Sequence, residues 1–475
     1  MPRRPAPSLP RPARPARPAR PASSVRPAWP VRLAWPVLLL LWAVALAACA
    51  RPGPWAPVAD LALPQSASAY LAPATADAPL WPADRAAALA ETLRQRRFAP
   101  WRRGTAAHSA DELFWGLKLL DRPLWGENLL PRPPAWAAGI LAQCRRDAYP
   151  SDGRRAVATA NTSLRLLPDA RPAFYDPRAP GEGYPFDMLQ NSGVWAGTPL
   201  YVTHLSADGG WALAEAPYAA GWVPITDLGF VSDEFAATVE SLGLAAVVRE
   251  GAPLADASGL FRFTGRVGML LPVDDSGRAL LPVRQADGNA ALTPAGPLDG
   301  DLAPFPLAPT PRTLAGLADQ LMGQPYGWGG LYQDRDCSAL MQDLFAPLGL
   351  ALPRNSKEQA AVGTWIPLEG PAYADDGAKE LAILERGRPF ATLVRKPGHI
   401  MLYLGPRDDG SGPRPMVLHA MWGLRSDREF PTPGRKVVGA VVVTTLTPGR
   451  ELREVQKPGG LLVHGVTGLA LLPGD

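Results

Sequence analysis

A cysteine at a predicted helix start places the strongest constraint on the C-terminal third of this chain. The glycine-rich turn Tyr326-Gly327-Trp328-Gly329-Gly330 leads to Asp336-Cys337-Ser338, and apolar residues then recur at helical spacing up to Phe345. Asp336 suits the N-cap position, so Cys337 falls in the first helical turn. There the unpaired backbone N–H groups and the positive end of the helix dipole favour a thiolate. We therefore expect a domain built around a helix that begins at Cys337.

A preceding helix is predicted between Thr310 and residue 321. Thr310 suits the N-cap and Pro311 suits the first helical position. Gly323 and Pro325 are expected to end this helix. Its apolar residues share one face, which must pack against a core: Leu314, Leu317, Ala318 and Leu321.

Two histidines lie on predicted strands further along the chain. His399 follows Pro397-Gly398 and precedes the apolar run Ile400 to Leu404, so it lies where a strand leaves a turn. His419 lies in the next predicted strand. A Gly- and Pro-rich loop from Pro406 to Pro415 is expected to join the two strands.

These residue types fit nucleophilic catalysis. An imidazole within hydrogen-bond reach of a thiol can accept its proton and later protonate a leaving amine, and a third group must orient the ring. Cys337 is thus the candidate nucleophile, His399 the candidate base and acid, and His419 the candidate orienting group. A single helix cysteine is usually a small buried residue, so the hypothesis depends on the three residues together.

The first 48 residues have the composition of a secretory signal. They contain eight Arg and no Asp or Glu, and they end in an apolar run of 12 residues from Val37 to Ala48. That run is too short to cross a bilayer as a helix. It closes with Leu46-Ala47-Ala48-Cys49, which resembles the lipobox of bacterial lipoproteins, so we expect a lipid on Cys49. The alternative is an ordinary signal peptide whose last cysteine is accidental.

Charge and cysteine usage narrow the function further. Outside the first 48 residues, 40 Lys and Arg face 44 Asp and Glu, so a nucleic-acid partner is not expected. A disulfide between Cys144 and Cys337 would cap the candidate nucleophile, so we expect Cys337 to be free and Cys144 to be inert. No Cys or His spacing resembles a zinc site, and we expect neither a metal nor a cofactor.

The remaining sequence falls into stretches with different residue patterns. Residues 49–150 combine a Pro- and Ala-rich start with helical patterning, which predicts a helical or irregular wrapping segment. From about residue 151, short alternating runs such as Thr198 to His204 are separated by Asp-Gly turns, which predicts adjacent strands. Residues 237–300 repeat this texture more loosely, and a Pro-rich linker follows from Leu298 to Pro309.

The catalytic candidates resemble a known family. The order of Tyr326 and Trp328, Asp336-Cys337-Ser338, Gly398-His399 and His419 is similar to that in the NlpC/P60 family of bacterial cell-wall cysteine peptidases. The β region resembles bacterial SH3 domains. The resemblance implies a multidomain fold with a helical or irregular N-terminal segment, two SH3-like β-barrels and a C-terminal α+β papain-like NlpC/P60 domain. The implied divisions are 1–48 (lipoprotein signal peptide), 49–150 (N-terminal segment), 151–236 (first barrel), 237–300 (second barrel) and 301–475 (catalytic domain).

The resemblance also implies the reaction. It implies a cysteine endopeptidase that cleaves the γ-D-glutamyl to diamino acid bond of peptidoglycan stem peptides through a triad of Cys337, His399 and His419. The first barrel is expected to line the cleft, with Asp187 and Tyr218 as candidates, although Asp187 is equally suited to cap a turn. The implied substrate-binding residues are Tyr326, Trp328, Asp336, Ser338 and Ser356.

The implied partners are peptidoglycan stem peptides and a membrane that holds the lipid anchor. The expected location is the cell envelope, at the periplasmic face of the outer or inner membrane in a Gram-negative cell, and the expected state is a monomer. Two alternatives stay open: a non-catalytic SH3-like peptidoglycan-binding lipoprotein, and a related Cys-His amidase or acyltransferase. The complete set of catalytic motifs argues against the first of these.

Overall fold

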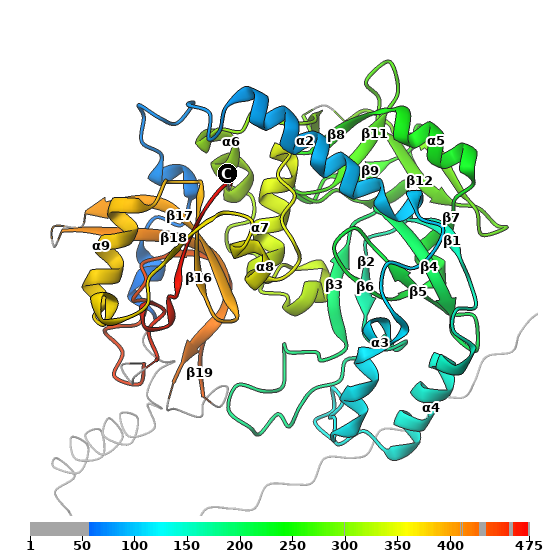
Figure 1. Cartoon of the computed structure of the whole chain (residues 1–475), viewed down its shortest axis with the longest axis horizontal. Coiled ribbons are helices and arrows are strands. Elements are labelled where there is room, and N and C mark those ends of the chain that lie inside the picture. Colours follow the sequence, from blue (N-terminus) through cyan, green and yellow to red (C-terminus); the bar gives the residue numbers. More distant parts are fainter. Residues whose placement is uncertain are drawn as a thin grey trace, which may run out of the picture. The chain divides into compact units, whose positions relative to one another are not determined.

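The computed structural model describes residues 57–298, 300–408, 410, 412–426, 434–455 and 459–473. Residues 57 to 475 fall into one compact unit, part of which Figure 1 shows in colour. The predicted signal segment and Cys49 lie outside the described residues. None of the described helices is both long enough and apolar enough to span a membrane.

The N-terminal segment is mostly helical and irregular, as predicted. Its longest helix, α2, contacts three domains: Ala90 lies against Gly349 of the C-terminal domain, and Arg97 donates to carbonyl oxygens of Gly197 and Leu270 in the two barrels. Figure 1 shows α2, in blue, passing α7 and the strands of the second barrel. The segment therefore ties the domains together. Its α-helices are α2 (Ala83–Phe98), α3 (Ala110–Leu113) and α4 (Pro134–Cys144).

The first barrel confirms the predicted SH3-like texture. Its strands pair antiparallel in one seven-stranded sheet with the order β3-β2-β6-β5-β4-β1-β7. Alternate small and β-branched residues such as Val202, Ala212 and Val223 fill its interior. The strands are β1 (Arg154–Ala158), β2 (Thr162–Arg165), β3 (Gln190–Val194), β4 (Pro199–Leu205), β5 (Trp211–Glu215), β6 (Ala220–Pro224) and β7 (Leu228–Phe230).

The second barrel follows the helix α5 (Asp233–Ser241) and consists of three small sheets. One of its strands, β14, pairs with β8 and lies inside the stretch predicted as a linker, so this domain continues past the predicted boundary at residue 300. Side chains of separate strands, including Leu254, Leu271 and Leu281, form its core. The strands are β8 (Gly243–Val247), β9 (Pro253–Ala255), β10 (Phe261–Thr264), β11 (Leu270–Val273), β12 (Leu280–Arg284), β13 (Ala290–Pro294) and β14 (Leu302–Pro304).

The C-terminal domain is an α+β layer built on a six-stranded sheet with the order β15-β20-β16-β17-β18-β19. Helices α6 and α7 pack on one face of the sheet, and α9 packs on the other. The helices are α6 (Pro311–Asp319), α7 (Cys337–Phe345), α8 (Ser356–Ala360) and α9 (Asp376–Arg386). The strands are β15 (Thr364–Pro367), β16 (Thr392–Lys396), β17 (His399–Asp408), β18 (Pro413–Arg425), β19 (Arg435–Thr444) and β20 (Gly468–Leu471).

Strands β17 and β18 correct one prediction. The segment from Pro406 to Pro415 was expected to be a loop, but β17 runs to Asp408 and β18 begins at Pro413. The two strands pair up to that end, because Pro406 faces Pro415 and Arg407 faces Arg414 in the register. Proline is tolerated here since neither residue interrupts a central part of the sheet. The paired strands hold His399 and His419 in a fixed register.

A buried cation joins the second barrel to the C-terminal domain. The Arg335 side chain is fully buried and donates from Nη1 to Oε1 of Glu250 at 3.0 Å and from Nε to Oδ2 of Asp343 at 2.7 Å. Although burial opposes it, the two carboxylates raise the pKa of Arg335. The charge is therefore compensated by one carboxylate from each side of the domain boundary.

Replacing Arg335 by Met should lower the free energy of unfolding by about 3–5 kcal/mol, because two buried carboxylates would lose their cation. Urea denaturation followed by tryptophan fluorescence measures this loss. Arg312→Met is the matched control: Arg312 and Asp77 form an exposed pair whose attraction is screened by solvent, so this variant should lose far less stability. Equal losses in the two variants would contradict the role given to Arg335.

Candidate active site

Cys337 is the first residue of α7, as predicted. Asp336 caps the helix, because its Oδ1 accepts from the backbone N–H of Ala339 at 2.8 Å. The Cys337 side chain is 7% exposed and packs with Ile400 of β17 in the main core of the domain. The backbone N–H of Ile400, the residue after His399, is directed at the sulfur. The helix that carries Cys337 therefore packs against the strand that begins at His399.

The protonation state of Cys337 differs from the prediction. Burial and the neighbouring Asp336 carboxylate raise the pKa of the thiol to about 12. The backbone N–H groups of Ile400 and Ser338 oppose this shift, as expected at a helix start, but they do not outweigh it. At neutral pH the resting nucleophile is therefore a thiol, and it needs a base at the moment of attack.

The two histidines form a hydrogen-bonded pair. Nε2 of His399 lies 2.8 Å from Nδ1 of His419, which is fully buried. Burial and the charge of Lys396 lower the pKa of His399 to about 3. Burial, with His399 beside it, places the pKa of His419 well below its usual value. Both rings are consequently neutral at physiological pH, so each has one N–H donor and one acceptor.

A threonine decides which nitrogen carries each proton. Thr444 on β19 donates its hydroxyl proton to the carbonyl oxygen of Thr445 at 2.7 Å, so its Oγ1 can only accept from Nε2 of His419 at 3.0 Å. His419 therefore has its proton on Nε2 and accepts at Nδ1. His399 then donates from Nε2, and its Nδ1 keeps a free lone pair. We assign Nδ1 of His399 as the base that faces the thiol.

Asp336 has no acceptor left for a ligand. Its carboxylate accepts from the backbone N–H groups of Ala339 and Gly329, from the Ser338 hydroxyl and from two nitrogens of Arg354, at 2.7 to 3.1 Å. Although burial opposes it, Arg354 lowers the pKa of Asp336. A carboxylate offers about four lone pairs, so this set is complete. Asp336 thus holds the helix start, and the predicted substrate contact is not open to it.

Arg354 is a residue that sequence reasoning missed. It donates to Asp336 and Ser338 on the catalytic helix, and its Nε donates to the hydroxyl of Ser192 on β3 at 2.9 Å. Its sequence context, a Pro before it and a helix N-cap after it, signals only a loop. Ser338 is 6% exposed and shares this network. The first barrel is therefore fastened to the residues on both sides of Cys337.

The glycine-rich turn fits tightly against the first barrel. Gly330 has φ of 89°, and a Cβ at this position would lie 2.3 Å from the backbone nitrogen of Gly193. The carbonyl of Gly329 accepts from Nε2 of Gln190 on β3 at 3.0 Å. No side chain fits at Gly330, which explains the glycine. The turn that carries Tyr326 and Trp328 is consequently positioned by the barrel.

Aromatic side chains gather beside this turn. Trp328 meets Phe186 of the first barrel edge to face at 5.2 Å between ring centroids, and Tyr326 lies 6.2 Å from Trp422 of β18. Burial, with Cys337 and Asp336 nearby, raises the pKa of Tyr326 well above its usual value. The Tyr326 phenol therefore stays protonated near the sulfur and can donate a hydrogen bond. Trp422 was not identified from the sequence.

The structure does not show the other candidate residues predicted from the sequence in contact with Cys337. Ser356 is the first residue of α8, and its side chain has no hydrogen bond to the described part of the chain. Asp187 is fully buried, pairs with Arg165 at 2.7 Å and accepts from two backbone N–H groups, so it stabilises a turn and does not line the cleft. Tyr218 lines a cavity that does not include Cys337. Cys144 and Cys337 are both free, as predicted, and both are buried.

The residue types at this site suit acyl transfer. A thiol whose neighbouring base has a free lone pair can attack a carbonyl carbon, and the same base can then protonate the leaving group. This arrangement lies in an α+β domain that follows two SH3-like barrels. The fold and the site together define a multidomain cysteine hydrolase.

Comparison with protein-family models supports this class of protein. Residues 323–420 match the NlpC/P60 family, and residues 33–149 match the N-terminal NLPC_P60 stabilising domain. Residues 172–224 match an SH3 domain of SH3b1 type, and residues 232–278 match one of SH3b2 type. The chain therefore contains an NlpC/P60 domain, an N-terminal stabilising domain and two SH3b domains.

One solved structure shares the fold of this chain. An NlpC/P60 endopeptidase from Photobacterium damselae subsp. piscicida is similar with a TM-score of 0.79 and 22% sequence identity, over 89% of this chain and 99% of that chain. An NlpC/P60 family protein from Bacillus cereus ATCC 10987 has a TM-score of 0.41 and 15% identity, over 67% of this chain and 99% of that chain. No curated protein matches the chain.

The raised pKa of Cys337 predicts slow alkylation at neutral pH. In a Cys49→Ser, Cys144→Ala background, iodoacetamide should label Cys337 more slowly at pH 7 than it labels a free cysteine amide. Since the thiolate fraction grows tenfold per pH unit up to a pKa of about 12, the labelling rate should still rise above pH 9. Fast labelling that is independent of pH below 7 would instead indicate a resting thiolate.

Proposed function

We propose that this protein is a peptidoglycan stem-peptide hydrolase that cleaves the bond between γ-D-glutamate and the diamino acid. The observation that carries this proposal is the hydrogen-bonded arrangement of His399, His419 and Thr444 beside Cys337 in an NlpC/P60 domain. Its relative from Photobacterium damselae is described as an endopeptidase, which supports a peptide substrate. The choice of bond comes from the resemblance of the catalytic motifs to the family.

The proposed reaction begins with the Cys337 thiol and the His399 imidazole both neutral. Sγ of Cys337 attacks the γ-carbonyl carbon while the thiol proton moves to Nδ1 of His399. Nδ1 of His419 accepts a hydrogen bond from the Nε2–H group of the His399 imidazolium and so keeps this ring in its orientation. His399 then gives the proton to the leaving amine, and the carbon–nitrogen bond breaks. A thioester remains on Cys337, with the diamino acid released.

Water completes the cycle. His399 accepts a proton from a water molecule whose oxygen attacks the thioester carbon, and the proton passes to the departing sulfur. The negative charge that develops on the carbonyl oxygen needs donors. The backbone N–H groups at the start of α7 and the protonated phenol of Tyr326 lie near the sulfur and suit this role. Both half-reactions therefore use the same groups.

We further propose that the enzyme acts in the cell envelope on a lipid tether. The support is the sequence alone: an apolar run of 12 residues closes with Leu46-Ala47-Ala48-Cys49. The two SH3b domains suit a protein that works on the wall, since they add surface beside the catalytic domain.

Product analysis tests the proposed bond. Wild-type protein should convert L-Ala-γ-D-Glu-diaminopimelate to L-Ala-D-Glu and free diaminopimelate, as identified by mass spectrometry. Cys337→Ala should lower the rate by at least about a thousandfold, because the nucleophile is lost. Cys144→Ala is the matched control and should keep wild-type activity, since this buried thiol lies in another core.

Two outcomes would reject the proposal. Equal rates in wild-type protein and Cys337→Ala would exclude cysteine catalysis. Release of the sugar from a muramyl tripeptide offered in parallel, or transfer of the acyl group to an added amine in place of water, would favour the amidase or acyltransferase alternative.

Thr444 provides a test of the proton arrangement. Thr444→Val keeps the shape but removes the acceptor for His419, so the histidine pair loses its preferred tautomer. The value of kcat should fall by roughly a hundredfold or more while KM changes little. Thr444→Ser keeps the hydroxyl and should restore most of the activity. A rise in KM alone, or an equal fall in kcat in both variants, would show that Thr444 acts only through packing.

A further inference from the structure

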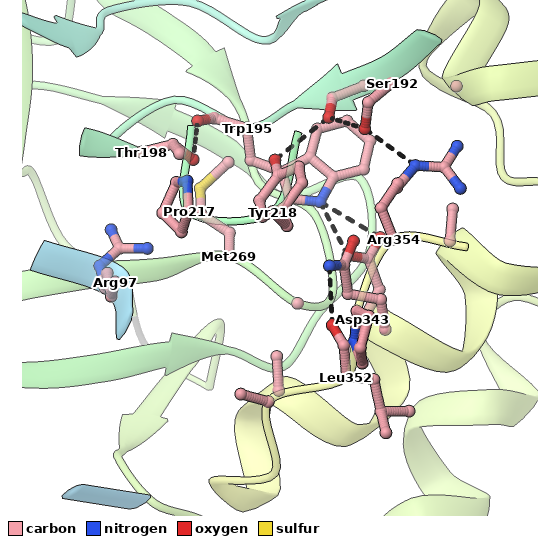
Figure 2. Close-up of a pocket in the computed structure, with 18 of the residues that line it drawn as sticks. Arg97, Ser192, Trp195, Thr198, Pro217, Tyr218, Met269, Asp343, Leu352 and Arg354 are labelled. Atoms are coloured by element: carbon pink, nitrogen blue, oxygen red, sulfur yellow. Dashed lines mark hydrogen bonds between the residues drawn. The ribbon is translucent and has the colours of Figure 1, made fainter. Parts of the chain in front are cut away.

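A cavity in the described part of the chain lies behind the catalytic helix. It has a volume of about 440 Å³, which is within the usual range for small-molecule sites. Residues from α2, both barrels and the C-terminal domain line it, and Figure 2 shows its labelled side chains. Neither Cys337 nor either catalytic histidine lines the cavity.

The periodicity of α7 separates this cavity from the active site. Ala339, Gln342 and Asp343 of α7 line the cavity, and Ala346 lines it just after the helix. These residues recur at the spacing of one helix face. At about 100° per residue, Cys337 points to the opposite side, where it meets Ile400. The cavity is thus a second concave site on the back of the nucleophile helix.

Its walls are mainly apolar and aromatic. Trp195 and Tyr218 of the first barrel face Met269 of the second barrel (Figure 2). The polar ends of the two rings are already satisfied: the Trp195 Nε1 donates to Asp343, and the Tyr218 hydroxyl donates to the carbonyl of Gly193. A ligand that enters here would meet ring faces and a thioether, which favour an apolar or aromatic body.

Three carboxylates line the cavity: Asp334, Asp343 and Glu358. The first two lie beside arginines, whereas Glu358 forms no ion pair within the described residues. Asp343 accepts from Nε of Arg335 at 2.7 Å, and Asp334 lies in the field of Arg266 and Arg335. Asp334 and Asp343 therefore carry no uncompensated negative charge that would attract a cation.

Arg97 of α2 also lines the cavity, and its side chain donates to backbone carbonyl oxygens. Its Nη2 donates to the carbonyl oxygens of Gly197 and Leu270 at 2.6 and 2.7 Å, and its Nε is buried without a hydrogen-bond partner. Among the described residues it forms no ion pair with a carboxylate. Burial lowers the pKa of Arg97 to about 10. An anion that approaches a guanidinium enclosed in this way would stabilise its charge.

We propose that this cavity binds a small organic acid with an apolar or aromatic body, whose carboxylate pairs with Arg97 and whose body lies between Trp195, Tyr218 and Met269. In Figure 2 Arg97 lies at one side of these residues and Arg354 lies at the other. Arg354 also lines the cavity and holds Asp336 and Ser338 beside Cys337. The bound acid therefore shares a wall residue with the active site but occupies a separate volume.

Calorimetry with 4-phenylbutyrate tests the proposal on the full chain. Wild-type protein should bind one equivalent saturably, and the uncharged 4-phenylbutanamide should bind at least tenfold more weakly. Arg97→Gln should weaken 4-phenylbutyrate binding at least tenfold, because the carboxylate loses its partner. Arg85→Gln is the matched control: this arginine of α2 is exposed and does not line the cavity, so its variant should bind as the wild type does.

A second variant covers the case in which Arg97→Gln fails to fold. Ala346→Phe fills the cavity from the end of α7 without touching Arg97, and it should abolish binding while thermal unfolding shows an intact protein. The proposal is overturned by three results: no saturable binding up to about 10 mM, equal affinity for acid and amide, or undiminished binding in a folded Arg97→Gln or Ala346→Phe protein.

Discussion

The active site depends on one chain of hydrogen bonds that starts at a backbone carbonyl. The Thr445 carbonyl oxygen can only accept, so it fixes the Thr444 hydroxyl, which fixes the proton of His419 and then that of His399. Each member is buried or partly buried, so water does not compete for these protons. The result is a neutral His399 ring with an unprotonated Nδ1, in the same domain as a neutral Cys337 thiol. Burial, which raises the pKa of Cys337, therefore makes this orientation necessary for reaction.

The nucleophile depends in turn on the first barrel. Arg354 connects Ser192 of β3 to Asp336 and Ser338, and the glycine turn leaves no space between Gly330 and Gly193. Because Asp336 is saturated by these donors, its charge stabilises the start of α7 and is not available to a ligand. The barrels are consequently part of the catalytic structure. The cavity behind α7 lies among the same domains, which allows its occupancy to affect Arg354.

The sequence predicted the elements that local chemistry determines. Asp336 as a cap, Cys337 at the helix start, Thr310 with Pro311 and His399 at a strand start all follow from short-range rules, and each is found. Arg354, Thr444 and Trp422 act through partners distant in sequence, so no local pattern marks them. The sign of the Cys337 pKa shift was wrong for the same reason: helix position is local, whereas burial by β17 is not. The predicted loop at Pro406 became paired strands because the sheet register extends through both prolines.

Nitrogen NMR of the imidazole rings measures the proton chain directly. The sequence contains five histidines, so protein labelled with [15N]histidine gives few signals, and single substitutions assign them. At pH 6 the account predicts that His399 and His419 are both neutral, each with its proton on Nε2 and a bare Nδ1. An imidazolium at His399, or a proton on its Nδ1, would contradict the account, because the thiol would then have no base.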